Sequence, residues 1–290
     1  MRILSFIFIL LAANLANADT LDARAIMEKV DAQQRQVAHQ TLTLSRLSSC
    51  AFARSESGIV CTEEPRVKVL ESYSIQEGPA LKDSKSIAIV LEPANERGIG
   101  MLTYSYDDTA KDTESWLYLS ALGKVKRLAS GSGEDQEPVS FFGSEFTTED
   151  MENGKTDEYD YRILQSGPYA GSKVWVIEAV PRPVRVPKTR YSKLLLWIDQ
   201  DRFVPLKMQG YDRRGELWKR MSFAQIEQHN GLWLARQATL FNLEKQRLST
   251  MHTDKITQGV PADSEFLTQR PLVDFAYRER VLQGLRAHFE

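Results

Sequence analysis

The stretch from Lys173 to Ile256 decides the fold, because it reads as six strands: KVWVIEAVP (173–181), RYSKLLLWI (190–198), FVPLKMQGY (203–211), ELWKRMSFAQI (216–226), LWLARQATLF (232–241) and QRLSTMHTDKI (246–256). Each is rich in β-branched, aromatic and large aliphatic residues. Short polar turns such as Asn230-Gly231 separate all neighbours but one pair, which a proline-rich connection at 181–187 joins. Connections this short cannot hold crossover helices, so the sequence predicts a large antiparallel sheet that must curl or split.

Residues 1–18 predict a cleavable secretory signal peptide. Arg2 precedes an apolar run over 3–13, and Ala16-Asn17-Ala18 is a small-x-small cleavage site. The apolar run is too short to span a bilayer. We therefore expect a soluble protein exported to the periplasm of a Gram-negative bacterium, and an uncleaved N-terminal anchor is the alternative.

The remaining chain is nearly balanced in charge. The whole sequence holds 37 Lys and Arg against 39 Asp and Glu, for a net charge of −2. This balance argues against nucleic acid or an anionic membrane surface as a partner. Since no linker-like segment or repeat divides the chain, we expect one domain.

The flanking segments predict further elements around the six strands. Residues 22–38 form a partial apolar stripe with Thr20 or Asp22 available as N-cap, which predicts a helix that docks on the sheet. A terminal helix is expected at 273–289. Additional strands are expected at 41–50, 65–76, 86–92, 100–106, 115–120 and 124–128.

Cys50 and Cys61 are the two cysteines of the chain, and they lie at matching ends of two expected hairpin strands. An even pair in an oxidising compartment predicts a disulfide. Two independent thiols are the alternative, and the spacing excludes a redox CxxC site.

Periodicity stops between Ser130 and Gly154, in SGSGEDQEPVSFFGSEFTTEDMENG. This stretch is acidic and rich in Gly and Ser, yet it contains Phe141, Phe142 and Phe146. One interpretation is a long surface loop with a local aromatic anchor. The other, which we favour, is a mobile lid or docking segment outside the permanent core, because long loops in compact domains are often functional.

Alternation along the strands assigns a set of large apolar side chains to one face of the sheet. Such a face could line a cavity that shelters acyl chains, each methylene gaining about 0.8 kcal/mol on leaving water. The same face could equally be the filled core of a barrel or sandwich, and periodicity does not separate the two. The candidates are Trp175, Ile177, Leu194, Leu196, Ile198, Val204, Leu206, Met208, Leu217, Met221 and Phe223.

Signals for catalysis or metal binding are weak. The four histidines are scattered, and the chain has no HExxH, CxxC or GxSxG motif. The acidic clusters Glu149-Asp150-Glu152 and Asp157-Glu158-Asp160 could pair carboxylates, but solvated loop charge is the favoured interpretation. We therefore predict a protein that is not an enzyme, with no catalytic residues, cofactor or metal site.

Several segments resemble the outer-membrane lipoprotein-sorting protein family, the LolA/LolB-like proteins. They are GIGMLTYSYDD (98–108), SWLYLSALGKVKRLA (115–129), FFGSEFTTEDM (141–151), LLLWIDQDRFVPLKMQGYDRRGEL (194–217) and DSEFLTQ (263–269). The resemblance implies a mainly β (α+β) fold, a large antiparallel incomplete β-barrel wrapped around helical elements, over residues 19–271. Two departures from the family are the acidic segment 133–137 and a C-terminal helical extension at 272–290.

The resemblance also implies a function. We expect a monomeric periplasmic carrier that binds lipid or lipoprotein acyl chains in an apolar cavity and shuttles them toward the outer membrane. An inner-membrane RND-type transporter is the implied partner. The alternative is a sensory or adaptor module of the same fold, which binds a lipoprotein or regulatory protein without carrying cargo.

Overall fold

The computed structural model describes residues 22–56, 58–128, 139–152 and 155–289. The expected signal peptide therefore lies outside the described residues, and so does part of the aperiodic stretch. Within those described ranges, no helix combines the length and apolarity that a membrane span requires.

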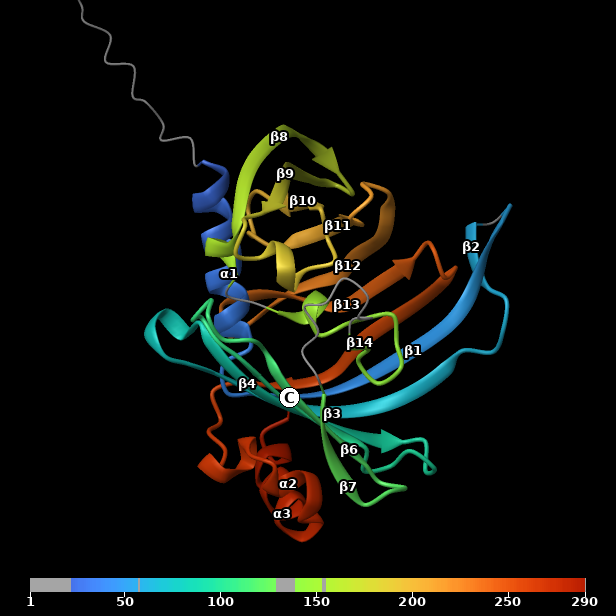
Figure 1. The fold of residues 1–290 in the computed structure, drawn as a ribbon, viewed down its shortest axis with the longest axis vertical. Coiled ribbons are helices and arrows are strands. Elements are labelled where there is room, and N and C mark those ends of the chain that lie inside the picture. The colour runs from blue at the N-terminus through green and yellow to red at the C-terminus, as the bar shows by residue number, and fades with distance from the viewer. Residues whose placement is uncertain (1–21, 57, 129–138, 153–154, 290) are drawn as a thin grey trace, which may run out of the picture.

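The described residues form one antiparallel sheet of fourteen strands. Its order is β7-β6-β5-β4-β3-β1-β14-β13-β12-β11-β10-β9-β8, and the short β2 pairs only with β1. Because β7 and β8 are both edges, the sheet curls without closing, which confirms the expected incomplete antiparallel barrel (Figure 1). The strands are β1 Thr41–Ser55, β2 Gly58–Cys61, β3 Arg66–Glu77, β4 Asp83–Glu92, β5 Gly100–Ser105, β6 Glu114–Leu119, β7 Lys124–Leu128, β8 Tyr159–Tyr169, β9 Ser172–Pro181, β10 Lys193–Asp199, β11 Pro205–Tyr211, β12 Leu217–His229, β13 Leu232–Asn242 and β14 Arg247–Thr257.

The six strands expected between Lys173 and Ile256 are β9 to β14, and each pairs with its sequence neighbour. The structure adds two strands that the sequence pattern did not predict. β8 is an edge strand whose side chains are mostly polar or exposed, and it contains Gly167-Pro168, a turn-like pair, just before its last residue Tyr169. β2 is a four-residue exposed strand in the polar tip of the first hairpin.

Helix α1, Ala23–Val37, lies on the concave face of the curled sheet (Figure 1). Its N-terminus is capped by Asp22, whose carboxylate accepts a hydrogen bond from the Ala25 N–H at 2.7 Å. Ile26 and Val30 are buried against Ile177 and Ile198 of the sheet. The expected helix and its docking site are therefore confirmed.

The C-terminal helices α2, Arg270–Val273, and α3, Phe275–Arg286, cover the outer face of the sheet at one end, over β1 and β3 to β6 (Figure 1). Leu272 and Leu282 are buried in one cluster with Tyr73 and Leu102 of the sheet. Arg286 of α3 also donates two hydrogen bonds, at 2.7 and 2.6 Å, to the buried carboxylate of Glu71 on β3. This packing makes α3 part of the folded unit, while a domain boundary at residue 271 stays a prediction.

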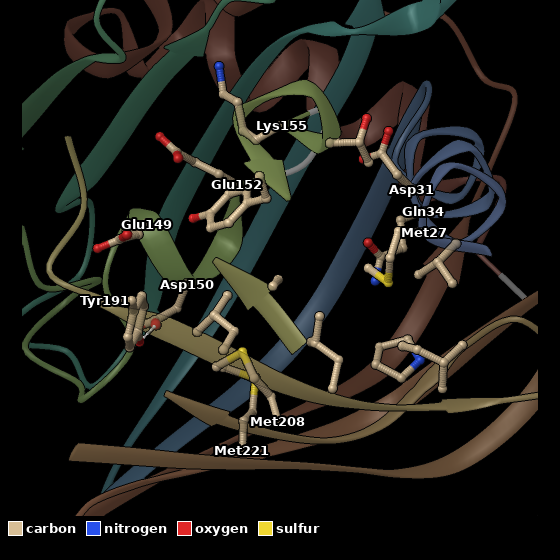
Figure 2. A pocket seen from close by; sticks show the side chains of 18 of the residues that line it. Met27, Asp31, Gln34, Glu149, Asp150, Glu152, Lys155, Tyr191, Met208 and Met221 are labelled. Carbon is tan, nitrogen blue, oxygen red and sulfur yellow. Dashed lines mark hydrogen bonds between the residues drawn. The ribbon is translucent and has the colours of Figure 1, made fainter. Parts of the chain in front are cut away.

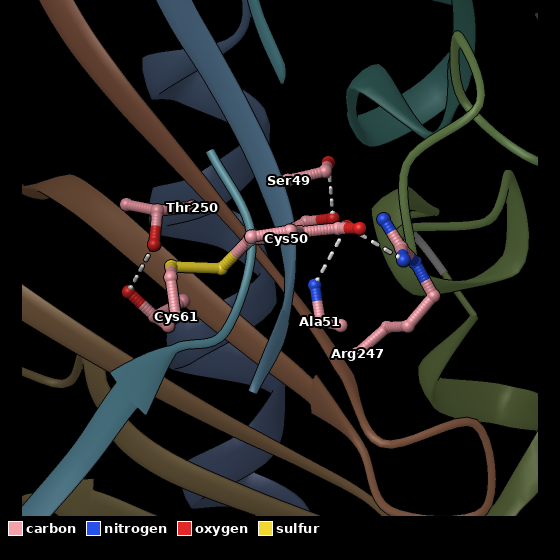
Figure 3. The surroundings of a disulfide bond; sticks show 9 residues. Ser49, Cys50, Ala51, Cys61, Arg247 and Thr250 are labelled. Atoms are coloured by element: carbon pink, nitrogen blue, oxygen red, sulfur yellow. Dashed lines mark hydrogen bonds and ion pairs between the residues drawn. A yellow bond between two sulfur atoms is a disulfide. The ribbon is translucent and has the colours of Figure 1, made fainter. Parts of the chain in front are cut away.

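Cys50 and Cys61 form a disulfide that joins β1 to the short β2 (Figure 3). Beside it, the carboxylate of Glu63 accepts hydrogen bonds from the Ala51 N–H and from the Arg247 guanidinium, both at 2.9 Å. The disulfide and this carboxylate together tie the protruding hairpin to β14.

Replacing Cys50 with serine is expected to lower the melting temperature without abolishing the fold. The bond closes a loop with a sequence separation of 11, which is worth about 3 kcal/mol in the chain-entropy model. Most strands of the sheet lie C-terminal to this pair of cysteines, so we expect them to form without the bond. Thiol titration of the denatured, non-reduced parent should find no free thiol; two free thiols, or a variant with an unchanged melting temperature, would refute the prediction.

Candidate functional site

A cavity of about 340 Å³ lies on the concave face between α1, strands β9 to β12 and the chain that connects β7 to β8. We call this chain, residues 139–152 and 155–158 of the described part, the edge connection. Figure 2 shows Met208 and Met221 on the sheet side, Met27 and Gln34 on the helix side, and Glu149 and Glu152 on the edge connection. The sheet side of the cavity is therefore apolar, and we call it the floor. The edge connection places charged side chains on the opposite side, which we call the roof.

Six of the eleven predicted cavity residues line this cavity: Leu194, Leu196, Ile198, Met208, Met221 and Phe223. Two more, Trp175 and Ile177, lie on the same face, where Ile177 pairs with Leu196 and Trp175 with Ile198. These two side chains pack in the cluster under α1 instead of lining the cavity. Their lipid-binding role stays a prediction.

The other three predicted residues do not face the cavity. Val204 and Leu206 pack with Val174 and Val176, which alternate with the inward residues of β9 and so lie on the opposite face. The reason is a β-bulge: Trp197 pairs with Lys207 and Ile198 with Pro205, which leaves Leu206 unpaired and turns it outward.

Leu217 is displaced by a similar irregularity. Gly210 pairs with Lys219 but the next residue, Tyr211, pairs with Leu217, so Trp218 is an extra residue on β12. Leu217 is half-buried and lines a separate surface depression with Asp212 and Glu244. The assignment of these three residues to the cavity face is therefore wrong, because strict alternation fails at a bulge.

Phe141, Phe142 and Phe146 are buried, with 8%, 7% and 3% of their surface exposed. The FFGSEF segment makes a tight turn in which Phe142 and Gly143 have φ of 50° and 75°, and Ser144 N–H donates to the Phe141 carbonyl at 3.1 Å. The rings pack in a cluster with sheet residues that include Leu47, Leu70, Val90, Met101 and Leu240. The expectation that these rings lie outside the core is not met in this structure, and a lid role stays a prediction.

The topology explains this burial. The edge connection lies in the sequence between β7 and β8, the two free edges of the sheet, and its described residues lie over the open side of the curled sheet (Figure 1). Its apolar side chains find the apolar concave face there and leave water. A local surface loop, which the composition suggested, would not make this crossing.

The roof contains a buried ion network around Arg185. Its guanidinium lies 2.8 Å from Glu152, 3.3 Å from Glu158 and 3.4 Å from Glu149, and it also donates to the Tyr159 hydroxyl at 3.2 Å. The interpretation of Glu149, Glu152 and Glu158 as solvated loop charges is therefore wrong. Arg185 comes from the proline-rich connection before β10, which the sequence pattern marked only as a stiff link.

A second buried ion pair joins the roof to the floor. Lys219 of β12 lies 2.6 Å from Asp150, and their side chains are 1% and 0% exposed. Asp150 also accepts hydrogen bonds from the Tyr191 hydroxyl and from the N–H and hydroxyl of Thr147, the last two at 2.8 Å. Asp150 therefore anchors the edge connection to the sheet.

Burial shifts the pKa values of several groups in the roof. Burial raises the pKa of Glu149 although Arg185 opposes the shift, and it raises the pKa of Tyr159 to about 12. Burial alone would lower the pKa of Arg185, but Tyr159 and the nearby carboxylates hold it above its usual value. The guanidinium therefore stays charged at all physiological pH values.

The phenol of Tyr159 is expected to make the protein less stable at alkaline pH. Its pKa is raised from 10.0 to about 12, so the folded state keeps a proton that the unfolded chain loses. Stability from this group is complete below pH 10 and is lost as the pH rises through 12, by about 2 to 3 kcal/mol. Denaturant titrations between pH 9 and pH 12 should show a shallower decline for Tyr159→Phe; equal slopes would contradict the assignment.

Within the described residues, no cluster of His, Cys, Asp or Glu side chains could hold a metal ion. The roof carboxylates are instead held by Arg185, Lys219 and hydroxyl donors. The arrangement is that of an apolar cavity beneath charged side chains that pair with one another.

A family model described as "-like: Uncharacterized protein" matches residues 82–274, which is 193 of the 290 residues. The chain belongs to this uncharacterized-protein family. The matched region of this family member runs from the start of β4 through α2, so it includes the edge connection and the cavity floor. No curated protein matches the chain.

Several solved structures are similar to this chain and share its fold. A DUF1329 family protein from Desulfovibrio piger matches with a TM-score of 0.75 and 22% identity, over 87% of this chain and 100% of that one. A Vibrio parahaemolyticus domain named for outer membrane lipoprotein sorting matches with a TM-score of 0.69 and 23% identity, over 87% and 98%. A LolA superfamily protein from Nitrosomonas europaea matches with a TM-score of 0.62 and 18% identity, over 85% and 98%. The family resemblance in the sequence is confirmed at the level of fold.

Proposed function

We propose that this protein is a periplasmic carrier that binds lipid or lipoprotein acyl chains in the cavity and moves them toward the outer membrane. The observation that carries the proposal is the apolar floor. Leu194, Leu196, Ile198, Met208 and Phe223 present hydrocarbon to an open space beside α1. A filled core would leave no such space.

The size of the cavity fits part of an acyl chain. Ligand pockets commonly measure about 300–1,000 Å³, so a cavity of about 340 Å³ is at the small end of that range. Each sheltered methylene contributes about 0.8 kcal/mol, so eight of them would contribute about 6 kcal/mol. Micromolar binding requires about 8 kcal/mol net of the costs of association, so the rest would have to come from a longer sheltered chain or from contacts to the head group.

The shared fold supports the proposed role and location. Among the similar structures are a domain named for outer membrane lipoprotein sorting and a LolA superfamily protein. An expected signal peptide at residues 1–18 fits export to the periplasm. By the same resemblance, an inner-membrane RND-type transporter is the proposed partner.

A second candidate function is a sensory or adaptor module that binds a lipoprotein or regulatory protein without cargo. The observation that favours it is the filling of the concave face by the protein's own edge connection, with three buried phenylalanines. If the protein is an adaptor, the edge connection is a permanent part of the core.

Mass spectrometry of organic extracts separates the two functions. Protein purified from its native periplasm without detergent should retain extractable lipid at near-stoichiometric amounts if it is a carrier. Lipid-free protein that still captures a defined protein partner would support the adaptor and contradict the carrier.

A further inference from the structure

A second cavity, of about 240 Å³, lies on the concave face of β3, β4 and β5. Hydroxyl groups dominate its sheet side, in contrast to the apolar floor of the first cavity. They belong to Ser72, Ser74, Ser84, Ser86, Thr103 and Ser105. Met151 and Glu152 of the edge connection line both cavities, so the two adjoin at this turn.

The strand register arranges these hydroxyls in rows. One row runs through Ser74, Ser86 and Thr103, which face one another across the three strands. Another row runs through Gln76, Ser84 and Ser105.

The next row, Ser72, Ala88 and Met101, begins the apolar part of the same face. On β3, β4 and β5 the side chains of the concave face therefore change from hydroxyl-bearing to apolar between the row of Ser86 and the row of Ala88. A ligand lying across this level would meet hydroxyls at one end and hydrocarbon at the other.

Several of these hydroxyls are available to a ligand. Ser105 is 5% exposed, and its hydroxyl has no hydrogen-bond partner among the described residues. Over the same described ranges, no side-chain hydrogen bond engages Ser72, Ser84 or Ser86. A buried hydroxyl without a partner is unfavourable, and a ligand that donates or accepts there removes the cost.

The charged groups at this cavity are already paired. Lys85 lies 2.8 Å from Glu77, and Glu152 lies 2.8 Å from Arg185 and accepts a hydrogen bond from the Thr113 hydroxyl at 2.8 Å. A phosphate would need an unpaired cation, and an ammonium would need an unpaired anion. The lining therefore favours an uncharged group that both donates and accepts hydrogen bonds.

We infer that the hydroxyl-lined cavity binds the uncharged polyol head group, such as glycerol or a sugar, of an amphiphile whose acyl chain lies in the apolar cavity. This inference rests on the proposed carrier function and adds a ligand class to it. The two adjoining cavities match the two chemical halves of such a molecule.

Competition with a fluorescent fatty acid tests the inference with three ligands of equal chain length: monolauroylglycerol, dodecanoate and dodecylphosphocholine. The parent should bind monolauroylglycerol at least about tenfold more tightly than the other two, as expected for two or more net hydrogen bonds. Ser86→Val combined with Thr103→Val should remove that preference while keeping dodecanoate binding. If this pair fails to fold, Ser84→Ala with Ser86→Ala removes hydroxyls without adding volume.

The matched control is Thr239→Val with Thr250→Val. These hydroxyls bond to each other at 3.0 Å on β13 and β14, and their loss should leave the preference unchanged. The inference is overturned if the parent does not prefer monolauroylglycerol, or if the variant with both Ser86 and Thr103 replaced keeps that preference. Neither result contradicts the proposed carrier function. A parent that binds none of the three ligands overturns both.

Discussion

Replacing Lys219 with alanine is expected to lower the free energy of unfolding by about 3–5 kcal/mol. The ammonium group lies 2.6 Å from Asp150, and both side chains are essentially excluded from water. Truncation leaves a buried carboxylate whose main compensating charge is gone, and this is among the costliest single changes a folded protein undergoes. Denaturant unfolding monitored by tryptophan fluorescence measures the effect.

The exposed pair of Arg46 and Asp254 provides the matched control. It has a similar separation of 2.6 Å, but the Arg46 side chain is 57% exposed. Arg46→Ala should therefore cost less than about 1 kcal/mol. Equal losses in the two variants would show that the Lys219 pair is not shielded from solvent as described.

Met208→Asp is expected to weaken binding of a fluorescent fatty acid by at least about a hundredfold. Met208 stands opposite both Leu196 and Met221 in the sheet, and all three line the apolar cavity. A carboxylate there keeps water in the cavity and opposes entry of an acyl chain. Fluorescence titration of the folded variant, verified by circular dichroism, gives the affinity.

Gln209→Asp introduces the same charge one residue further along β11, on the other face of the sheet. It should bind the fatty acid as the parent does. Parent-like binding by Met208→Asp, or a loss in both variants, would mean that the cavity assigned here is not the binding site.

The sequence predicted the parts of the fold that depend on simple periodicity. Apolar alternation and short turns located β9 to β14, and an N-cap with an apolar stripe located α1. Strand β8 was missed because an edge strand buries little, so its sequence lacks an apolar run. Leu194, Leu196 and Met208 line the cavity because their strand segments keep strict alternation, and their lipid-binding role stays a prediction.

The errors arise where the pattern depends on a distant partner. Bulges in β11 and at the start of β12 turn Leu206 and Leu217 to the opposite face of the sheet. No residue nearby in the sequence predicts these bulges. The acidic cluster near Glu149 resembled solvated charge because its partner Arg185 is far along the chain. Likewise the three phenylalanines looked like loop residues, since only the tertiary path across the open side of the sheet buries them.

The strand order has a consequence for how the protein acquires its structure. β1 lies between β3 and β14, so the first strand of the chain has one of its two neighbours at the far end of the sequence. If the chain is exported as proposed, its N-terminal part reaches the periplasm first, and β1 and β3 to β7 can pair there while one edge of β1 stays open. That edge is a template for wrong pairing until β14 emerges. A chain truncated before Arg247 should therefore keep an unprotected edge on β1, and we expect it to aggregate more readily than the full chain.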